Sequence, residues 1–187
     1  MARTHYVKKA RKDVPNSDIK KGESYYWWKF RFGSKHTSRT PPKQSQLTQS
    51  EFLGTIYDIE DRISGLDYDD LESEIPDIIS ELENLREECE EKRGNMPEQL
   101  QDSGSGEMLQ NRSDSVQEMI DELEGIDIDI DIDEEDIRND IKENAEKEND
   151  ETQEDFKERI NEETDEEIEN KKQEVLDEVQ GITYNGE

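Results

Sequence analysis

The sequence predicts a mainly α protein with a small N-terminal β-hairpin, an antiparallel helical hairpin or coiled-coil body, and a long acidic C-terminal helix. Three observations predict this fold class. Aromatic residues crowd into residues 25–32, which is typical of a strand. Apolar residues recur every three or four positions across residues 71–89, as in a coiled coil. Residues 134–180 combine dense charge with a sparse apolar stripe, which favours a solvated helix.

Composition limits the size of the core. Of the 187 residues, 28% are hydrophobic and 41% are charged, close to the composition at which chains fail to bury enough surface to fold. The core is therefore expected to be thin and mostly helical. Cys89 is the single cysteine, so no intramolecular disulfide forms. With no apolar run of membrane-spanning length and no signal-peptide pattern, we expect a cytoplasmic, intracellular protein that does not bind membranes.

Charge is segregated along the chain. Residues 1–48 contain 12 Lys or Arg and 3 Asp or Glu, a net charge of +9. Residues 49–187 contain 12 Lys or Arg and 50 Asp or Glu, a net charge of −38. Opposed halves of this kind suggest a basic binding module carried on an acidic body. The partners expected from this pattern are DNA or RNA for residues 1–43 and a basic protein for residues 125–180.

Five segments follow from composition and periodicity. They are a flexible basic arm (1–23), an aromatic β-hairpin plus helix (24–64), an antiparallel helical hairpin (65–124), an extended Ile-Asp segment (125–133), and an acidic helix with a tail (134–187). The arm is expected to follow a phosphate backbone; the alternative is a solvated tail that only aids solubility.

The aromatic run predicts a strand whose side chains alternate between two faces. Tyr26, Trp28, Phe30 and Phe32 would share an apolar face, and Tyr25, Trp27, Lys29 and Arg31 the other. Gly33-Ser34 suits a type II′ turn into a return strand over residues 35–40, which Pro41-Pro42 ends. This pairing places Lys29 and Arg31 beside His36 and Ser38, and a slip of one residue would exchange the faces.

Flat rings interleaved with cations can stack on bases and neutralise phosphates. The alternative is that the aromatic residues only supply the small core that a hairpin needs. The residues predicted to contact nucleic acid are Tyr25, Trp27, Lys29, Arg31, Lys35, His36, Arg39, Lys8, Lys9, Arg11 and Lys12.

Residues 24–43 resemble the arm-type DNA-binding module found at the start of many phage integrases. The resemblance is carried by Tyr26, Trp28, Phe30, Arg31, Phe32, Gly33 and Lys35. The resemblance implies DNA contact and nothing more. No recombinase catalytic domain follows, because the chain has no histidine after His36. The whole chain also resembles uncharacterised phage-type proteins, a likeness that carries no function.

Three helices are predicted between residues 48 and 124. Thr48 and Glu51 form a capping box before a stripe of Phe52, Ile56, Ile59 and Ile63, which is expected to cover the hairpin and to end at Gly65. The next helix carries a seam, with regular helix expected from Pro76 onward and Cys89 placed in the core. The seam residues are Leu71, Ile75, Ile78, Leu82, Leu85 and Cys89. A third helix over residues 105–124 would pack antiparallel to it through Leu109, Val116, Ile120 and Leu123.

Residues 126–133 alternate Ile and Asp, which predicts an extended segment with its aspartates on one side. Asp127, Asp129, Asp131 and Asp133 would stand about 6.6 Å apart, in a row that imitates phosphates. Two other interpretations remain: an edge strand whose aspartates face water, or a loosely bound cation.

Residues for common catalytic sites are missing. His5 and His36 are the only histidines, and there is no cysteine pair, no HExxH motif and no nucleophile elbow. We therefore expect no enzyme, no cofactor and no metal. The favoured function is a non-enzymatic, nucleic-acid-associated binding protein. The alternatives are an acidic nucleic-acid mimic that inhibits a basic host-defence protein, and a coiled-coil scaffold that forms a homo-oligomer through the Leu71–Cys89 seam.

Overall fold

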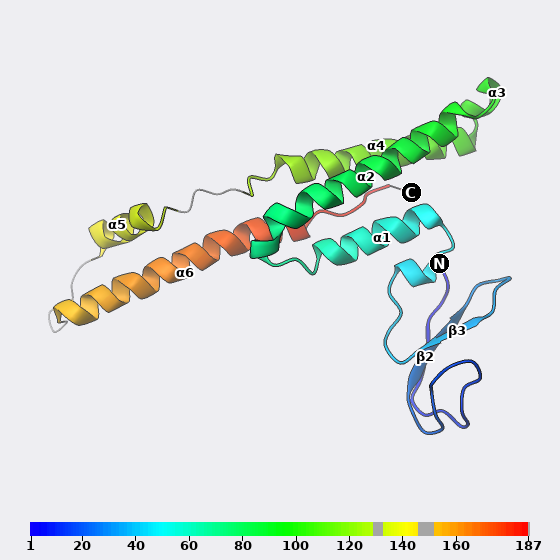
Figure 1. The fold of residues 1–187 in the computed structure, drawn as a ribbon, viewed down its shortest axis with the longest axis horizontal. Helices are drawn as coiled ribbons and strands as arrows, with labels where there is room; N and C mark the ends of the chain where they lie inside the picture. Colours follow the sequence, from blue (N-terminus) through cyan, green and yellow to red (C-terminus); the bar gives the residue numbers. More distant parts are fainter. Residues whose placement is uncertain (129–132, 146–151, 187) are drawn as a thin grey trace. The chain divides into compact units, whose positions relative to one another are not determined.

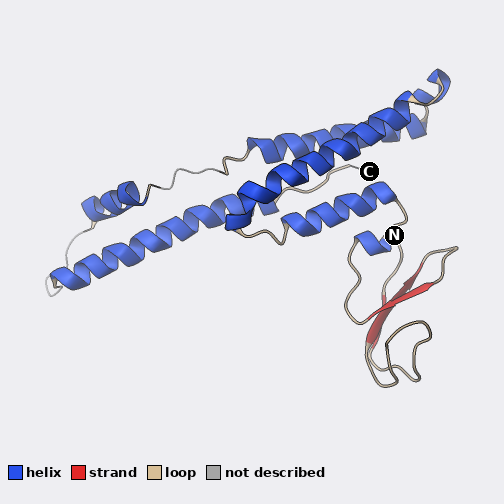
Figure 2. Ribbon diagram, in the orientation of Figure 1, coloured by secondary structure: helices blue, strands red, loops and turns tan. Residues whose placement is uncertain are grey.

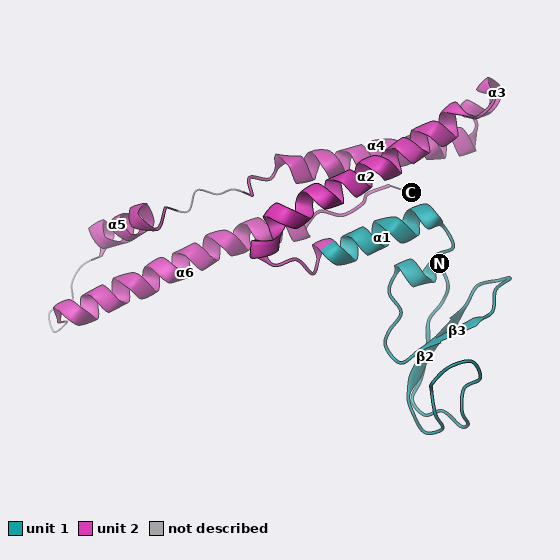
Figure 3. Cartoon of the chain, viewed as in Figure 1, with its two compact units in different colours: residues 1–62 teal, residues 63–187 magenta. Residues whose placement is uncertain are grey.

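The chain folds into two compact units, Met1–Arg62 and Ile63–Glu187 (Figure 3). The structure is a computed structural model, and it describes residues 1–128, 133–145 and 152–186. The predicted fold class is confirmed: the protein is mainly helical, with a small N-terminal antiparallel sheet and a long C-terminal helix (Figures 1 and 2).

The sheet in the first unit has three strands in the order β1-β2-β3, namely His5–Val7, Tyr25–Lys29 and Lys35–Ser38. The predicted hairpin is therefore present, but its register is not the expected one. Lys29 pairs with Lys35 and Trp28 pairs with His36, so Phe30–Ser34 forms a five-residue loop. The Gly33 N–H donates to the Phe30 carbonyl at 3.2 Å. Gly33 thus closes the turn instead of occupying its first central position, and the predicted two-residue turn is wrong.

Residues 1–23 differ from the flexible arm that we expected. Their first part supplies strand β1, and the Ala2 N–H donates to the Leu47 carbonyl at 2.7 Å. The loop over residues 8–24 is folded back on itself: Ala10 and Ile19 are buried, and Ala10 exchanges backbone hydrogen bonds with Gly22 and Glu23 at 2.9 and 2.8 Å. Buried apolar side chains and internal hydrogen bonds hold this loop in one conformation.

A 3-10 helix, Ser45–Leu47, precedes helix α1, Glu51–Ile63. The predicted stripe of α1 is buried at all four positions. The helix start is different, because the Ser50 hydroxyl, one residue before α1, accepts the Leu53 N–H at 3.3 Å. Thr48 instead accepts the Ser50 N–H at 3.1 Å in the preceding turn. Helix α1 lies apart from the strands (Figure 1), so it does not cover the hairpin as we expected.

The second unit begins with the short 3-10 helix η2, Tyr68–Asp70, and the helical hairpin predicted from the seam. Helix α2 is Leu71–Gly94, α3 is Glu98–Gln101, and α4 is Gly104–Gly125. Helices α2 and α4 lie side by side (Figure 1), and every seam residue is buried within the single chain. A homo-oligomer through this seam would first have to separate the two helices. Pro76 lies inside α2, which begins at Leu71 rather than at the proline.

The charged C-terminal part forms two helices rather than one. Helix α5 is Glu134–Asn144 and helix α6 is Gln153–Gln180, and the two pack together. A capping box begins α6: the Asp155 N–H donates to the Thr152 hydroxyl at 3.1 Å, and the Thr152 N–H donates to the Asp155 carboxylate at 3.2 Å. This double cap favours a helix start at Gln153.

No helix among the described residues is long and apolar enough to cross a membrane.

Replacing Leu82 with alanine should destabilise the second unit by about 2–5 kcal/mol, because its side chain is fully buried between packed helices. Urea unfolding monitored by circular dichroism measures the loss in the free energy of unfolding. The neighbouring Glu83→Ala is the control, since Glu83 is exposed on the same turn. Equal unfolding free energies for the two variants would contradict the packing described for α2.

Cys89 should react slowly with iodoacetamide in the native protein. Its side chain is buried, and burial raises the pKa of the thiol above its usual 9.0, so less thiolate is present at a given pH. The rate in native buffer is expected to be slower than the rate in urea by an order of magnitude or more. Equal rates would show that the thiol is open to solvent.

Candidate nucleic-acid interface

Strand pairing sorts the aromatic residues onto two faces of the sheet. The Trp27 face consists of His5, Val7, Tyr25, Trp27, Lys29, Lys35 and Thr37. The Trp28 face consists of Tyr6, Tyr26, Trp28, His36 and Ser38. The predicted grouping of Tyr25, Trp27 and Lys29 is confirmed, whereas His36 and Ser38 lie on the opposite face from the one expected.

The Trp28 face buries its central ring. Trp28 is 5% exposed, and the His36 ring stacks on it with centroids 5.4 Å apart. Phe30 meets the same His36 ring edge-on at 5.9 Å. His36 thus covers Trp28 instead of joining Lys29. The core interpretation holds for Trp28, whereas Tyr6 on the same face is 57% exposed. Phe32, expected on the same apolar face, is 91% exposed in the turn, beneath the guanidinium of Arg31.

The Trp27 face carries the interleaved rings and cations that the sequence predicts. The His5 ring stacks on Trp27 at 4.2 Å, with 13° between the ring planes. The Lys35 ammonium lies 4.3 Å from the Trp27 centroid and 5.6 Å from the Tyr25 centroid. Because β1 and β3 flank β2, His5 and Lys35 reach Trp27 from opposite sides. Trp27 therefore orders this face, while Tyr25 at its edge remains half-buried.

The first unit, every residue of which the structure describes, carries a surplus of positive charge. Its 62 residues include 13 Lys or Arg and 7 Asp or Glu, a net charge of +6. Seven predicted contact residues are exposed and form no ion pair with the acidic residues of this unit. They are Lys8, Lys9, Arg11, Lys12, Lys29, Arg31 and Lys35. Exposed cations that lack a local counter-charge are the electrostatic footprint of an anion-binding surface.

Arg39 has a structural role that the sequence did not predict. Its guanidinium donates to the Asp18 carbonyl at 2.7 Å and to the Glu23 carboxylate at 3.3 Å. The Lys20 N–H also donates to Glu23, at 2.7 Å. This N–H, and then Arg39, lower the pKa of Glu23 below its usual 4.5. Arg39 thus joins the end of β3 to the loop over residues 8–24.

A cleft of about 560 Å³ lies between this loop and the Trp27 face. We call it the Tyr25 cleft. On the sheet and hairpin side it is lined by Val7, Tyr25, Ser34, Lys35 and Thr37. On the loop side it is lined by Lys9, Ala10, Arg11, Lys12, Asp13, Val14, Pro15 and Asn16. It therefore combines four of the exposed cations with an aromatic floor.

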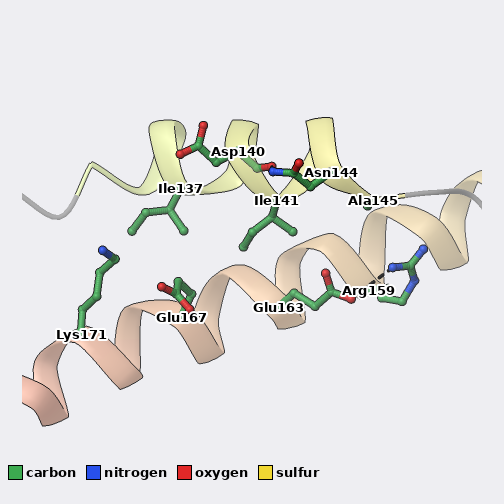
Figure 4. Close-up of a pocket in the computed structure, with 9 residues that line it drawn as sticks. All are labelled: Ile137, Asp140, Ile141, Asn144, Ala145, Arg159, Glu163, Glu167 and Lys171. Atoms are coloured by element: carbon green, nitrogen blue, oxygen red, sulfur yellow. Dashed lines mark hydrogen bonds and ion pairs between the residues drawn. The ribbon is translucent and has the colours of Figure 1, made fainter.

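A second cavity, of about 570 Å³, lies between α5 and α6 where the two helices pack (Figure 4). Ile137 and Ile141 of α5 point toward Glu163 and Glu167 of α6. Apolar side chains facing carboxylates pack poorly, and both isoleucines stay half-buried. Within the described ranges, no group of three or more His, Cys, Asp or Glu is arranged to hold a metal ion.

The predicted row of aspartates is only partly placed. Asp129 and Asp131 lie outside the described residues. Asp127 is exposed after the end of α4. The Asp133 carboxylate accepts the Glu135 and Asp136 N–H groups at 2.9 and 3.2 Å, which makes it the N-cap of α5. A helix cap is a role that the alternation of Ile and Asp did not reveal.

Sequence reasoning missed the contribution of β1 and the loop that follows it. His5 stacks on Trp27, and the Tyr6 and Tyr26 rings lie 4.9 Å apart. The available signal was the β-prone run His5-Tyr6-Val7, which is short and lies among cations.

Replacing Arg39 with glutamine should loosen the loop, because both hydrogen bonds from its guanidinium are lost. Amide hydrogen exchange at Lys20 and Glu23 is expected to speed up, with exchange in α2 unchanged as the internal control. Lowering the pH should likewise reduce the protection of these amides, measured relative to their intrinsic exchange rate at each pH. A lowered pKa means that the Glu23 carboxylate stabilises the loop above pH 4.5, and that this is lost as pH falls through the folded-state pKa. Unchanged exchange in both experiments would show that Arg39 does not hold the loop.

No protein-family model, curated protein or solved structure matches the chain. The resemblance of residues 24–43 to the integrase arm module therefore stays a prediction. Three of its residues, Phe30, Arg31 and Phe32, lie in the hairpin loop rather than in a strand.

Proposed function

We propose that the protein is a non-enzymatic nucleic-acid-binding protein whose first unit contacts DNA or RNA. One observation carries this proposal. The chain has 53 acidic residues, yet seven basic side chains of the first unit are exposed and form no ion pair with the acidic residues of that unit. Nucleic acids supply the closely spaced negative charge that such a surface lacks.

The arrangement of the cations supports contact with an extended polyanion. Lys8 follows β1, Lys29 ends β2, and Arg31 lies in the turn that joins β2 to β3. The cations thus occur at several points along the sheet and its loops. Each one that meets a phosphate releases counterions, and this release favours binding at low salt.

The second unit would restrict contact to the first. Residues 63–187 include 11 Lys or Arg and 46 Asp or Glu, a net charge of −35. This charge repels nucleic acid at short range, although salt screens the repulsion beyond about 8 Å at physiological ionic strength. A basic protein partner is the expected ligand for so acidic a surface.

The alternative function, a nucleic-acid mimic, is favoured by helix α6. Its 28 residues include 12 Asp or Glu and 4 Lys or Arg, and only Ile160, Thr164, Val175 and Val179 are buried. A helix of this length extends for about 42 Å, with most of its carboxylates in solvent. A mimic would occupy the basic groove of another protein and would not need the cations of the first unit.

The proposal is tested by measuring how the full chain binds labelled DNA and RNA oligonucleotides. Fluorescence anisotropy monitors this binding over a range of salt concentrations. The variant Lys8→Gln/Lys29→Gln/Arg31→Gln should bind more weakly. Its plot of log K against log salt should flatten by about 0.7–0.9 for each phosphate that the variant no longer neutralises.

The matched control is Lys142→Gln/Lys157→Gln/Lys171→Gln, which removes the same charge from the second unit. This control should bind nearly as well as the native chain, because its three lysines lie outside the first unit. If the native chain shows no salt-dependent binding, or if both triple variants lose the same affinity, the first unit is not a nucleic-acid interface.

A further inference from the structure

We propose that the Tyr25 cleft takes one unpaired base of a single-stranded nucleic acid, an inference that rests on the proposed function and names its ligand. The cleft brings together a ring, an apolar wall and cations, each of which matches a different part of a nucleotide.

The apolar part of the cleft fits a base in size and chemistry. Tyr25, Val7 and Thr37 come from adjacent strands, and Val14 and Pro15 face them from the loop. The volume of about 560 Å³ lies within the range of about 300–1,000 Å³ that small-molecule sites occupy. A flat, partly apolar ring stacked on an aromatic side chain is the usual way in which proteins hold an unstacked base.

Charge around the cleft selects an anion. The cleft is lined by four cations, Lys9, Arg11, Lys12 and Lys35, and by one carboxylate, Asp13. The Asp13 carboxylate accepts the Lys21 N–H at 2.8 Å and lies 3.8 Å from the Lys20 ammonium. The lining therefore has a net charge of +3, and its single carboxylate is already paired. A phosphate attached to the bound base would meet these cations.

The cleft is built before any ligand arrives. The Val14 N–H donates to the Ile19 carbonyl at 2.9 Å, and the Ser17 hydroxyl donates to the Val14 carbonyl at 3.0 Å. Asn16 adopts the left-handed conformation, with φ of 58°, which lets the chain reverse in a few residues. Because the wall is preformed, a ligand loses little affinity to the ordering of the loop.

Lys35 links the aromatic floor to the cationic lining. Its ammonium lies over both Trp27 and Tyr25, at 4.3 and 5.6 Å. A base laid on Tyr25 displaces the ammonium from that ring only, and the shorter distance to Trp27 keeps Lys35 beside the cleft. Its charge is then available to the phosphate of the bound nucleotide.

A concave site of this kind requires an unpaired base. In a duplex, both flat faces of each base are covered by its neighbours, so Tyr25 could not stack on it without unpairing and flipping the nucleotide. The structure therefore points to a single strand rather than to a duplex as the ligand of the cleft.

The test uses the full chain with short labelled strands of oligothymidylate and oligouridylate, a labelled duplex, and unlabelled thymidine monophosphate as a competitor. Tyr25→Leu removes the ring and keeps an apolar side chain, whereas Tyr25→Phe keeps the ring. Removal of one stacking interaction, worth about 1–3 kcal/mol, should weaken single-strand binding about 5- to 150-fold in Tyr25→Leu. Tyr25→Phe should bind like the native chain, and duplex binding should not change in either variant.

A second comparison, of two double variants, keeps the Tyr25 ring. Lys9→Gln/Lys35→Gln removes two cations that line it, and Lys8→Gln/Lys29→Gln removes two exposed cations that do not. The first pair should lose more affinity for single strands than the second. Equal losses, or unchanged single-strand binding in Tyr25→Leu, would overturn the inference and leave the proposed function standing.

Competition by thymidine monophosphate distinguishes a free nucleotide from a single strand as the ligand. Thymidine monophosphate that competes at the same concentration as the strand would identify a site for free nucleotides and would overturn the inference. Absence of salt-dependent binding to every probe would overturn the proposed function and this inference together. Binding of either single strand, with weaker binding in Tyr25→Leu, supports the inference.

Discussion

The pairing of Trp28 with His36 is the constraint on which the rest of the first unit depends. It buries the larger ring of one face under the imidazole and so turns Trp27 and Lys35 to the other face. Cross-strand pairs are the unit of sheet stabilisation, and in a three-stranded sheet few of them are available. The buried ring, Trp28, and the rings of the candidate interface, Tyr25 and Trp27, are therefore different residues of one short strand. A single run of aromatic residues serves both the core and the candidate interface.

Charge separation is the second organising feature. The first unit keeps a positive surplus while the second carries most of the carboxylates of the chain. The seven exposed basic side chains form no ion pair with the acidic residues of the first unit. In the second unit the apolar stripes of α2 and α4 are narrow, and the two helices bury them against each other. The proposed function rests on this separation, since the two units would attract partners of opposite charge.

Much of the helical part could be predicted because its signals are local. The six seam residues and the four residues of the α4 stripe are buried as their spacing requires. Prediction was less successful where one residue changes the outcome. The hairpin loop is three residues longer than expected, which moves His36 and Ser38 to the opposite face. The cap of α1 passes from Thr48 to Ser50, and the C-terminal helix divides before the capping box at Thr152. The sequence predicted the rings and cations of the candidate site. It did not predict the cleft, because the loop over residues 8–24 that forms one wall was expected to be part of a flexible arm.

The sequence by itself determined the helical hairpin over residues 65–124, the aromatic strand and the segregation of charge, because periodicity and composition act between neighbours in the chain. The tertiary structure alone decided the register of the sheet and the folding of residues 8–24 over the Trp27 face. It also decided that Arg39 donates hydrogen bonds to Asp18 and Glu23. These features depend on hydrogen bonds and ring contacts between residues far apart in sequence. Several registers satisfy the same alternating pattern, and only the closing of the whole sheet selects one of them.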